Sequence, residues 1–146
     1  KGDKYFQKKI VVRQLGENIN AALDERGEYV TIQSTYNLVP KANSEYVLGI
    51  LNSKLINWYY VKLFREKELF PRVLIENLRI IPIVEPKSPS ENKIADKISK
   101  LVLKLTENYK KKDENRVLEL ENEIDELVYG LYGVTDEERR TIERGA

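Results

Sequence analysis

The side chains of this sequence that could do chemistry are forked or basic, and they lie in its first half. Arginine and glutamine can each form two parallel hydrogen bonds with the edge of a base, Arg with guanine and Gln with adenine. Polar tracts at strand ends can contact bases or phosphates, and clusters of basic residues suit phosphate oxygens. These rules predict a set of nucleic-acid contacts made of Arg13, Gln14, Gln33, Ser34, Tyr36, Lys62, Arg65, Lys67 and Arg72.

Each of these groups also has a purely structural interpretation. Arg13 and Gln14 also fit an ordinary surface pair, and the polar tract 33–36 also fits an exposed strand end. Glu66 and Glu68 are interleaved with the basic residues 62–72, so that this surface could neutralise itself. Trp58, Tyr59 and Tyr60 could stack on bases, but their helical spacing predicts that at least two of them pack in the core.

The composition excludes the usual tools of most enzyme classes. The 146 residues are 41% hydrophobic and 34% charged, which is typical of one globular domain. The sequence has no Cys and no His, and it therefore lacks thiolate nucleophiles, Cys-based zinc sites and the commonest general base. It has no glycine-rich phosphate loop and no Asn/Asp-Pro-Pro-aromatic tetrapeptide. We therefore expect no catalytic residue, no cofactor and no metal in this chain.

Carboxylates are plentiful, and they gather in the second half of the chain. We expect the group there to form a solvated helix face and not a metal site or an acid/base pair. A small hydrolase that uses these carboxylates is a rival interpretation, and the absence of His makes it remote. The group consists of Glu119, Glu121, Glu123, Asp125 and Glu126.

Charge is segregated along the chain. Residues 1–83 have 13 basic and 9 acidic side chains, a net charge of +4, whereas residues 84–146 have 12 and 15, a net charge of −3. A basic half suggests an anionic partner, and an acidic half suggests a scaffold. No uncharged stretch approaches the length of a membrane span and no signal peptide precedes Lys1, so we expect a soluble, cytoplasmic protein. Because Met is absent, we expect an excised fragment or a processed chain.

The residue pattern of the first half predicts a small sheet and one helix. Runs at 9–14, 19–23 and 28–32 predict three strands of an antiparallel meander that ends near Pro40. Polar capping residues then precede apolar positions from Val47 to Tyr59 at spacings of three and four, which predict one helix of about five turns. The apolar run 78–84 predicts an edge strand, because Pro82 cannot donate to an interior ladder.

The second half reads as helices. The linker 85–90 contains a capping box, with Ser88 as N-cap, Pro89 at the first helical position and Glu91 three residues after the cap. Two apolar patterns out of phase across residues 110–114 predict an antiparallel helical pair, whose second member has a heptad seam. Thr135 opens a second capping box and a short final helix after Gly133. We predict an α+β fold with a sheet-bearing region 1–84, the linker 85–90 and a helical region 91–146.

Taken in order, these pieces resemble the TaqI-like C-terminal specificity domain. The resemblance is carried by the run from Ile10 to Gly16, by the octapeptide from Leu48 to Leu55, and by Phe70-Pro71-Arg72. It continues through the 78–83 segment and ends with 124–133 followed by Thr135-Asp136-Glu137-Glu138. The octapeptide and the Ile-Asp-x-Leu-Val-Tyr-x-Leu-Tyr ending are specific in combination, whereas each piece alone is weak.

The resemblance implies that the chain recognises target DNA for a restriction-modification enzyme. Domains of this family follow an adenine-N6 methyltransferase, often in a polypeptide that also carries a nuclease. The implied partners are therefore double-stranded DNA and the methyltransferase and nuclease domains of a parent enzyme. S-adenosylmethionine, and Mg²⁺ for a nuclease, would be cofactors of that parent.

One alternative is a protein-interaction module. The architecture is similar to the target-recognition halves of type I specificity subunits, whose helices pack as a spacer. The heptad seam leaves open a homodimer through the helices, in which DNA binding plays no part.

Overall fold

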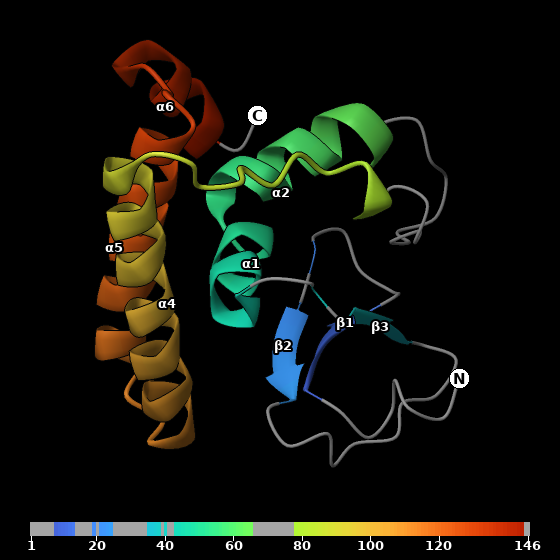
Figure 1. The fold of residues 1–146 in the computed structure, drawn as a ribbon, viewed down its shortest axis with the longest axis vertical. Coiled ribbons are helices and arrows are strands. Elements are labelled where there is room, and N and C mark those ends of the chain that lie inside the picture. Colours follow the sequence, from blue (N-terminus) through green and yellow to red (C-terminus); the bar gives the residue numbers. More distant parts are fainter. Residues whose placement is uncertain are drawn as a thin grey trace.

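The computed structural model describes residues 8–13, 19, 21–24, 35–38, 40, 43–65 and 78–144; for Arg13, 35–37 and Arg65 it describes the backbone alone. A small sheet and a pair of long helices lie on opposite sides of helix α1 (Ser44–Leu51) (Figure 1). Helix α2 (Lys54–Tyr60) and the π-helical turn η2 (Val61–Arg65) follow α1 along the chain. The α+β fold class that the sequence predicts is therefore confirmed.

The described sheet has three antiparallel strands in the order β2-β1-β3. Strand β1 (Lys9–Arg13) is rich in β-branched residues, as predicted, and pairs with β2 (Ala21–Asp24). Among the described strands, β3 (Thr35–Leu38) pairs with β1 and not with β2, so these three strands alone do not form a meander. The predicted strand 28–32 lies outside the described residues.

The prediction of a single five-turn helix after residue 43 is wrong, because the helix is interrupted at Asn52 and Ser53. The Ser53 hydroxyl donates to the carbonyl of Ile50 at 2.7 Å and accepts from the amide of Ile56 at 3.3 Å. It therefore closes the last turn of α1 and caps the first turn of α2. The apolar spacing continues across this break, so periodicity alone does not reveal it.

The edge strand predicted over residues 78–84 is also wrong: Leu78 belongs to a helical turn, and residues 82–87 are neither helix nor strand. Two tyrosine hydroxyls take the place of a neighbouring strand. Tyr132 donates to the carbonyl of Pro82 at 2.6 Å and accepts from the amide of Val84 at 3.2 Å, and Tyr46 donates to the carbonyl of Val84 at 2.7 Å. Because side chains satisfy these backbone groups, the segment needs no sheet.

The helical predictions for the second half are confirmed. Helix α4 (Pro89–Lys110) starts with the Ser88–Glu91 capping box, and α5 (Glu114–Leu131) starts after the N-cap Asp113. The two pack as an antiparallel pair (Figure 1). Gly133 adopts a φ of +66°, and the Thr135–Glu138 capping box then opens α6 (Asp136–Glu143). No helix in the described part of the chain has the length and apolar composition to cross a membrane.

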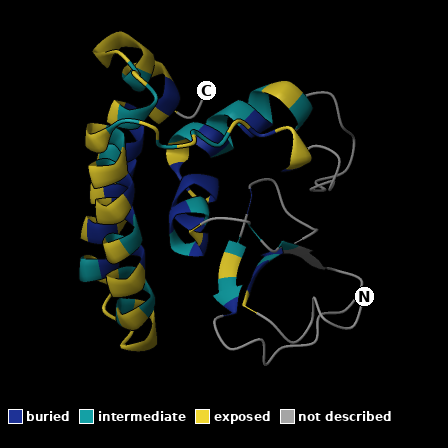
Figure 2. Ribbon diagram, viewed as in Figure 1, coloured by how far each residue is buried: buried dark blue, intermediate teal, exposed yellow. Residues whose placement is uncertain are grey.

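The core lies between the sheet, α1 and the helical pair. Figure 2 shows buried residues on α1 and exposed ones along the outer side of α4 and α5. A Cβ atom at Gly49 would lie 2.7 Å from Cγ2 of Ile98, so the glycine lets α1 approach α4 closely. The same cluster of buried residues includes members of the predicted regions 1–84 and 91–146, among them Ile10, Val12, Ile50, Ile56, Tyr60, Ile98, Val102, Ile124 and Val128.

Candidate nucleic-acid interface

Two of the predicted base-contacting positions lie together at one end of the sheet. Strand β1 ends at Arg13 and β3 begins at Thr35, and these two residues are direct partners in the register. Tyr36 is the partner of Val12, one step away along the strands. The structure therefore brings Arg13 and Tyr36 onto neighbouring strands. The predicted contacts Gln14, Gln33 and Ser34 lie outside the described residues.

Two of the predicted phosphate-contacting residues lie in η2. Lys62 is half-buried and Arg65 is the last residue of this turn. In Figure 1, α2 runs from α1 away from the helical pair, so that η2 lies on the same side of α1 as the sheet. The structure thus places Lys62 and Arg65 within one helical turn, whereas Lys67 and Arg72 lie outside the described residues.

Lys8, which precedes β1, and Lys9, its first residue, already form ion pairs within the protein. Lys8 forms an ion pair with Glu45 at 2.6 Å, and Lys9 forms one with Asp24. Both members of the second pair are fully or almost fully buried, and they face each other across the β1–β2 register. Carboxylates of the protein therefore already neutralise both lysines, and we do not count them among the candidates for phosphate contact.

A row of lysines on α4 is not among the contacts predicted from the sequence. Its members are spaced by four, three and four residues, so they lie on one helix face, opposite the buried face that includes Ile98 and Val102. All are exposed, and within the described part of the chain none lies within 4.0 Å of a carboxylate. The spacing alone could have revealed the row, which consists of Lys93, Lys97, Lys100 and Lys104.

The acidic group of α5 is solvated as predicted, with one exception. Glu119, Glu121, Glu123 and Glu126 are exposed, but Asp125 is 8% exposed and accepts a hydrogen bond from the amide of Lys54 at 2.9 Å. The prediction of a solvated Asp125 is therefore wrong. Burial raises the pKa of Asp125 from its ordinary 3.8 to about 6, against the lowering effect of the Lys54 amide.

The aromatic residues of α2 are divided between core and surface. Tyr60 is fully buried and its ring packs on Phe64 with 5.3 Å between centroids. Of the three aromatic residues it alone belongs to the described buried core, so the prediction that at least two of them pack in the core is wrong. Trp58 and Tyr59 are half-buried, although the indole Nε1 of Trp58 is covered. Of the three residues, Tyr60 is therefore a structural residue and not a stacking platform.

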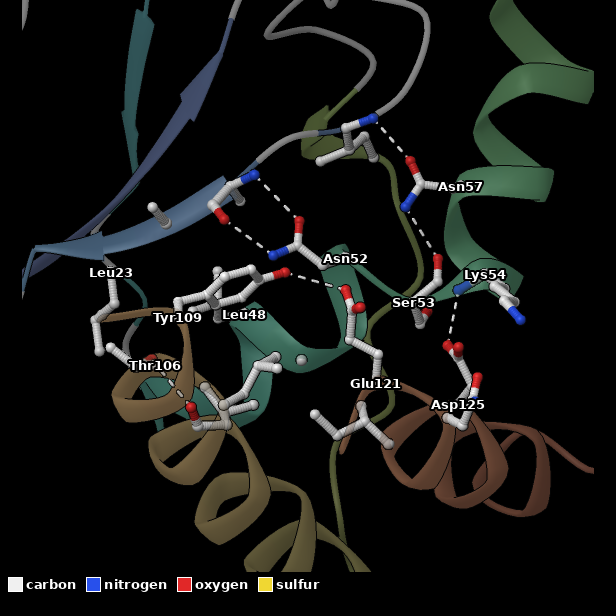
Figure 3. Close-up of a pocket in the computed structure, with 18 of the residues that line it drawn as sticks. Leu23, Leu48, Asn52, Ser53, Lys54, Asn57, Thr106, Tyr109, Glu121 and Asp125 are labelled. Carbon is white, nitrogen blue, oxygen red and sulfur yellow. Dashed lines mark hydrogen bonds between the residues drawn. The ribbon is translucent and has the colours of Figure 1, made fainter. Parts of the chain in front are cut away.

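The octapeptide 48–55 forms a junction that sequence reasoning could not resolve. An open pocket of about 900 Å³ lies between β2, α1 and the helical pair (Figure 3). At its rim, the Asn52 amide accepts from the backbone N–H of Ala21 at 3.1 Å and donates to the carbonyl of the same residue at 2.9 Å. Asn57 accepts from the backbone N–H of Ile19 at 2.7 Å. Asn52 and Asn57 thus form hydrogen bonds with the backbone of Ala21, the first residue of β2, and of Ile19, two residues before it.

The described part of the chain offers no cluster of carboxylates for metal binding. Among the described residues, no group of three or more His, Cys, Asp or Glu side chains could hold a metal ion. The Tyr109 hydroxyl donates to Oε2 of Glu121 at 3.1 Å, which occupies one carboxylate beside the pocket.

Comparison with known proteins identifies the class of domain. The model of the TaqI-like C-terminal specificity domain matches residues 2–83, which is more than half of the chain. The chain therefore belongs to this family, and the resemblance inferred from the sequence is confirmed. The matched residues include all three described strands, α1, α2 and η2.

A relative in Methanocaldococcus jannaschii is named as a type II restriction enzyme and methyltransferase, RM.MjaORFECS2P. It is 37% identical to this chain over 136 residues, which cover 89% of the chain. The same residues amount to 11% of the relative, so the chain spans about a tenth of that protein's length. The family and this relative together support a DNA-recognition domain of a restriction-modification enzyme.

Proposed function

We propose that this chain reads the base sequence of a DNA target for a restriction-modification enzyme. In this proposal, other domains of the enzyme methylate adenine within the target, and a nuclease domain cuts unmethylated DNA. Three findings support it: membership of the specificity-domain family, the net charge of +4 over residues 1–83, and the pairing of β1 with β3 at Arg13 and Thr35. The register carries most of the mechanistic argument, because it places the candidate positions Arg13 and Tyr36 on paired strands, one step apart at the same sheet end.

The proposed contacts divide into two kinds. Basic residues from Lys62 to Arg72 hold the phosphates and fix the register of the domain on the duplex. Side chains at the sheet end read base edges in the major groove, where each base pair presents a distinct pattern of donors and acceptors. The second group consists of Arg13, Gln14, Gln33, Ser34 and Tyr36.

The helical pair has a different role in this proposal. Helices α4 and α5 pack against α1 and α2, so they set the distance between the sheet and the parent's catalytic domains. S-adenosylmethionine, and Mg²⁺ for the nuclease, would bind to those domains. This chain then contributes binding and positioning, and no proton transfer or covalent step.

Matched charge removal tests the division of roles. One variant carries Arg65→Gln, Lys67→Gln and Arg72→Gln, and its control carries Lys97→Gln, Lys100→Gln and Lys104→Gln on α4. We expect the first variant to bind a fluorescent duplex more weakly than wild type and to lower the slope of log K against log salt by up to about 3, since each neutralised phosphate contributes about 0.9. Fluorescence anisotropy between about 50 and 200 mM salt measures both.

The control variant loses the same charge from a face that the proposal keeps away from DNA. We expect its affinity and its salt slope to stay close to those of wild type. Equal losses in the two variants would contradict the proposal, because binding would then follow net charge and not the position of the charges. Wild-type binding that does not depend on salt would contradict it as well.

A further inference from the structure

The outer edge of β2 is paired with side chains. Strand β1 occupies one edge of β2, and in the described residues no strand occupies the other. Asn52 supplies an acceptor and a donor to the backbone of Ala21, which is the pattern a neighbouring strand would supply. Asn57 supplies an acceptor to Ile19, two residues earlier. Both asparagines therefore bind one edge of the β2 segment (Figure 3).

The two asparagines are themselves held in place. The amide nitrogen of Asn57 donates to the carbonyls of Ser53 and Leu51 at 3.0 and 3.3 Å, and Ser53 joins α1 to α2 through its own hydroxyl. The next amide, that of Lys54, donates to Asp125 of α5. Hydrogen bonds at Lys54 and at Asn52, joined by the backbone of residues 52–54, thus connect α5 to β2.

Satisfying buried polar groups does not explain the Asn52 bonds. Asn52 is exposed, and its two bonds to Ala21 lie where water could replace them. What water cannot provide is a fixed distance between the α1–α2 junction and β2. The same junction leads through α2 into η2, which carries Lys62 and Arg65. The asparagines therefore link the sheet to the element that holds the candidate phosphate contacts.

We infer that Asn52 and Asn57 are positioning residues for target selection, which fix the sheet relative to η2 so that base contacts and phosphate contacts are made together. This inference rests on the proposed function. Losing the link leaves each set of contacts intact but removes their alignment. Binding to any duplex then survives through phosphate contacts, and preference for one sequence is lost.

Selection from a random duplex pool tests the inference. The 146-residue chain and its variants are each incubated with duplexes randomised over a central segment, and sequencing of the bound fraction gives the enrichment of the preferred sequence. Asn52→Asp keeps the acceptor for the amide of Ala21 and sets a carboxylate oxygen against the carbonyl of that residue. Asn92→Asp, on the exposed first turn of α4, makes the same charge change far from the sheet and is the control.

We expect Asn52→Asp to lower the enrichment by about tenfold or more, which is the loss of roughly one base contact, while its affinity for a non-target duplex equals that of Asn92→Asp. Circular dichroism checks that each variant folds. If Asn52→Asp does not fold, the enrichment measured with Asn52→Ala is the test, because water can replace the lost hydrogen bonds at that exposed position. A role in stability alone would lower target and non-target binding by the same factor.

Each result separates the two hypotheses. If wild type enriches a sequence and both Asn52 variants enrich it equally, or if target and non-target binding fall together, the positioning role is wrong and the proposed function stands. If wild type enriches no sequence, the proposed function fails and the inference fails with it.

Discussion

At the scale of the residue, Asp125 has the least expected environment. Its neighbours on α5, Glu121 and Glu126, are exposed, and from the sequence Asp125 looks like one of them. Its hydrogen-bond partner, the amide of Lys54, is 71 residues away along the chain. No local pattern contains that information, because the contact exists only once α2 packs against α5. A carboxylate at a helix N-terminus also interacts favourably with the helix dipole, which partly offsets its burial.

The raised pKa of Asp125 makes a prediction about pH and stability. Because the pKa is about 6 in the folded protein and 3.8 ordinarily, the folded state retains a proton between these values that the unfolded state has released. The free energy of unfolding therefore falls as the pH rises through this window, and the contribution of Asp125 is lost above it. We expect Asp125→Asn, whose amide oxygen can still accept from Lys54, to be more stable than wild type at pH 7.5 by on the order of 1–3 kcal/mol.

Urea unfolding at about pH 4.5 and pH 7.5 measures the effect. The comparison between wild type and variant is essential, because other carboxylates act with the opposite sign. The amide of Ser88 lowers the pKa of Glu91, and that of Thr135 lowers the pKa of Glu138, so these groups lose stabilising interactions as the pH falls. A variant with the same pH dependence as wild type would show that Asp125 does not titrate in this window.

At the scale of the element, local signals predict well and long-range ones do not. Both capping boxes, the helical pair and the break at Gly133 are where the sequence predicts them, because a cap is completed within four residues. The segment 78–84 fails as a strand because its backbone partners are the hydroxyls of Tyr46 and Tyr132, far away in the sequence. The long helix fails because Ser53 caps α2 without interrupting the apolar spacing.

The contact between α1 and α4 makes a prediction at this scale. A methyl group at Gly49 would lie 2.7 Å from Cγ2 of Ile98 and 3.1 Å from Cγ2 of Val102, so the two helices would have to move apart. We expect Gly49→Ala to lower the free energy of unfolding by about 1–3 kcal/mol, which is typical of an overpacked core. Thermal or urea unfolding measures the loss.

Gly130 provides the matched control, since it lies in α5 and a Cβ atom there would meet nothing within 4 Å. We expect Gly130→Ala to raise stability by about 0.5–1 kcal/mol, because alanine has the higher helix propensity. A double variant Gly49→Ala with Ile98→Ala should cost less than the sum of its parts, since the second change removes the clashing Cγ2. Additive losses would contradict a direct clash.

At the scale of the whole molecule, the sequence predicts the class of domain better than its site. The octapeptide, the Tyr-Gly-Leu-Tyr ending and the segregated charge together indicate a specificity domain, and the family match confirms it. Of the nine candidate contacts, Arg13 and Tyr36 lie on paired strands and Lys62 and Arg65 share η2. The other five lie outside the described residues and stay predictions. Base contacts depend on side-chain positions that no spacing rule supplies.

In the proposed function, DNA contacts the sheet and the η2 region and does not contact the helical pair. Lysine footprinting tests it most directly, by acetylating the chain with and without a duplex and reading each lysine by mass spectrometry. We expect the duplex to protect Lys62 and Lys67 from acetylation. The α4 row should be acetylated equally with and without duplex; it consists of Lys93, Lys97, Lys100 and Lys104. Protection of the α4 row without protection of Lys62 and Lys67 would contradict it.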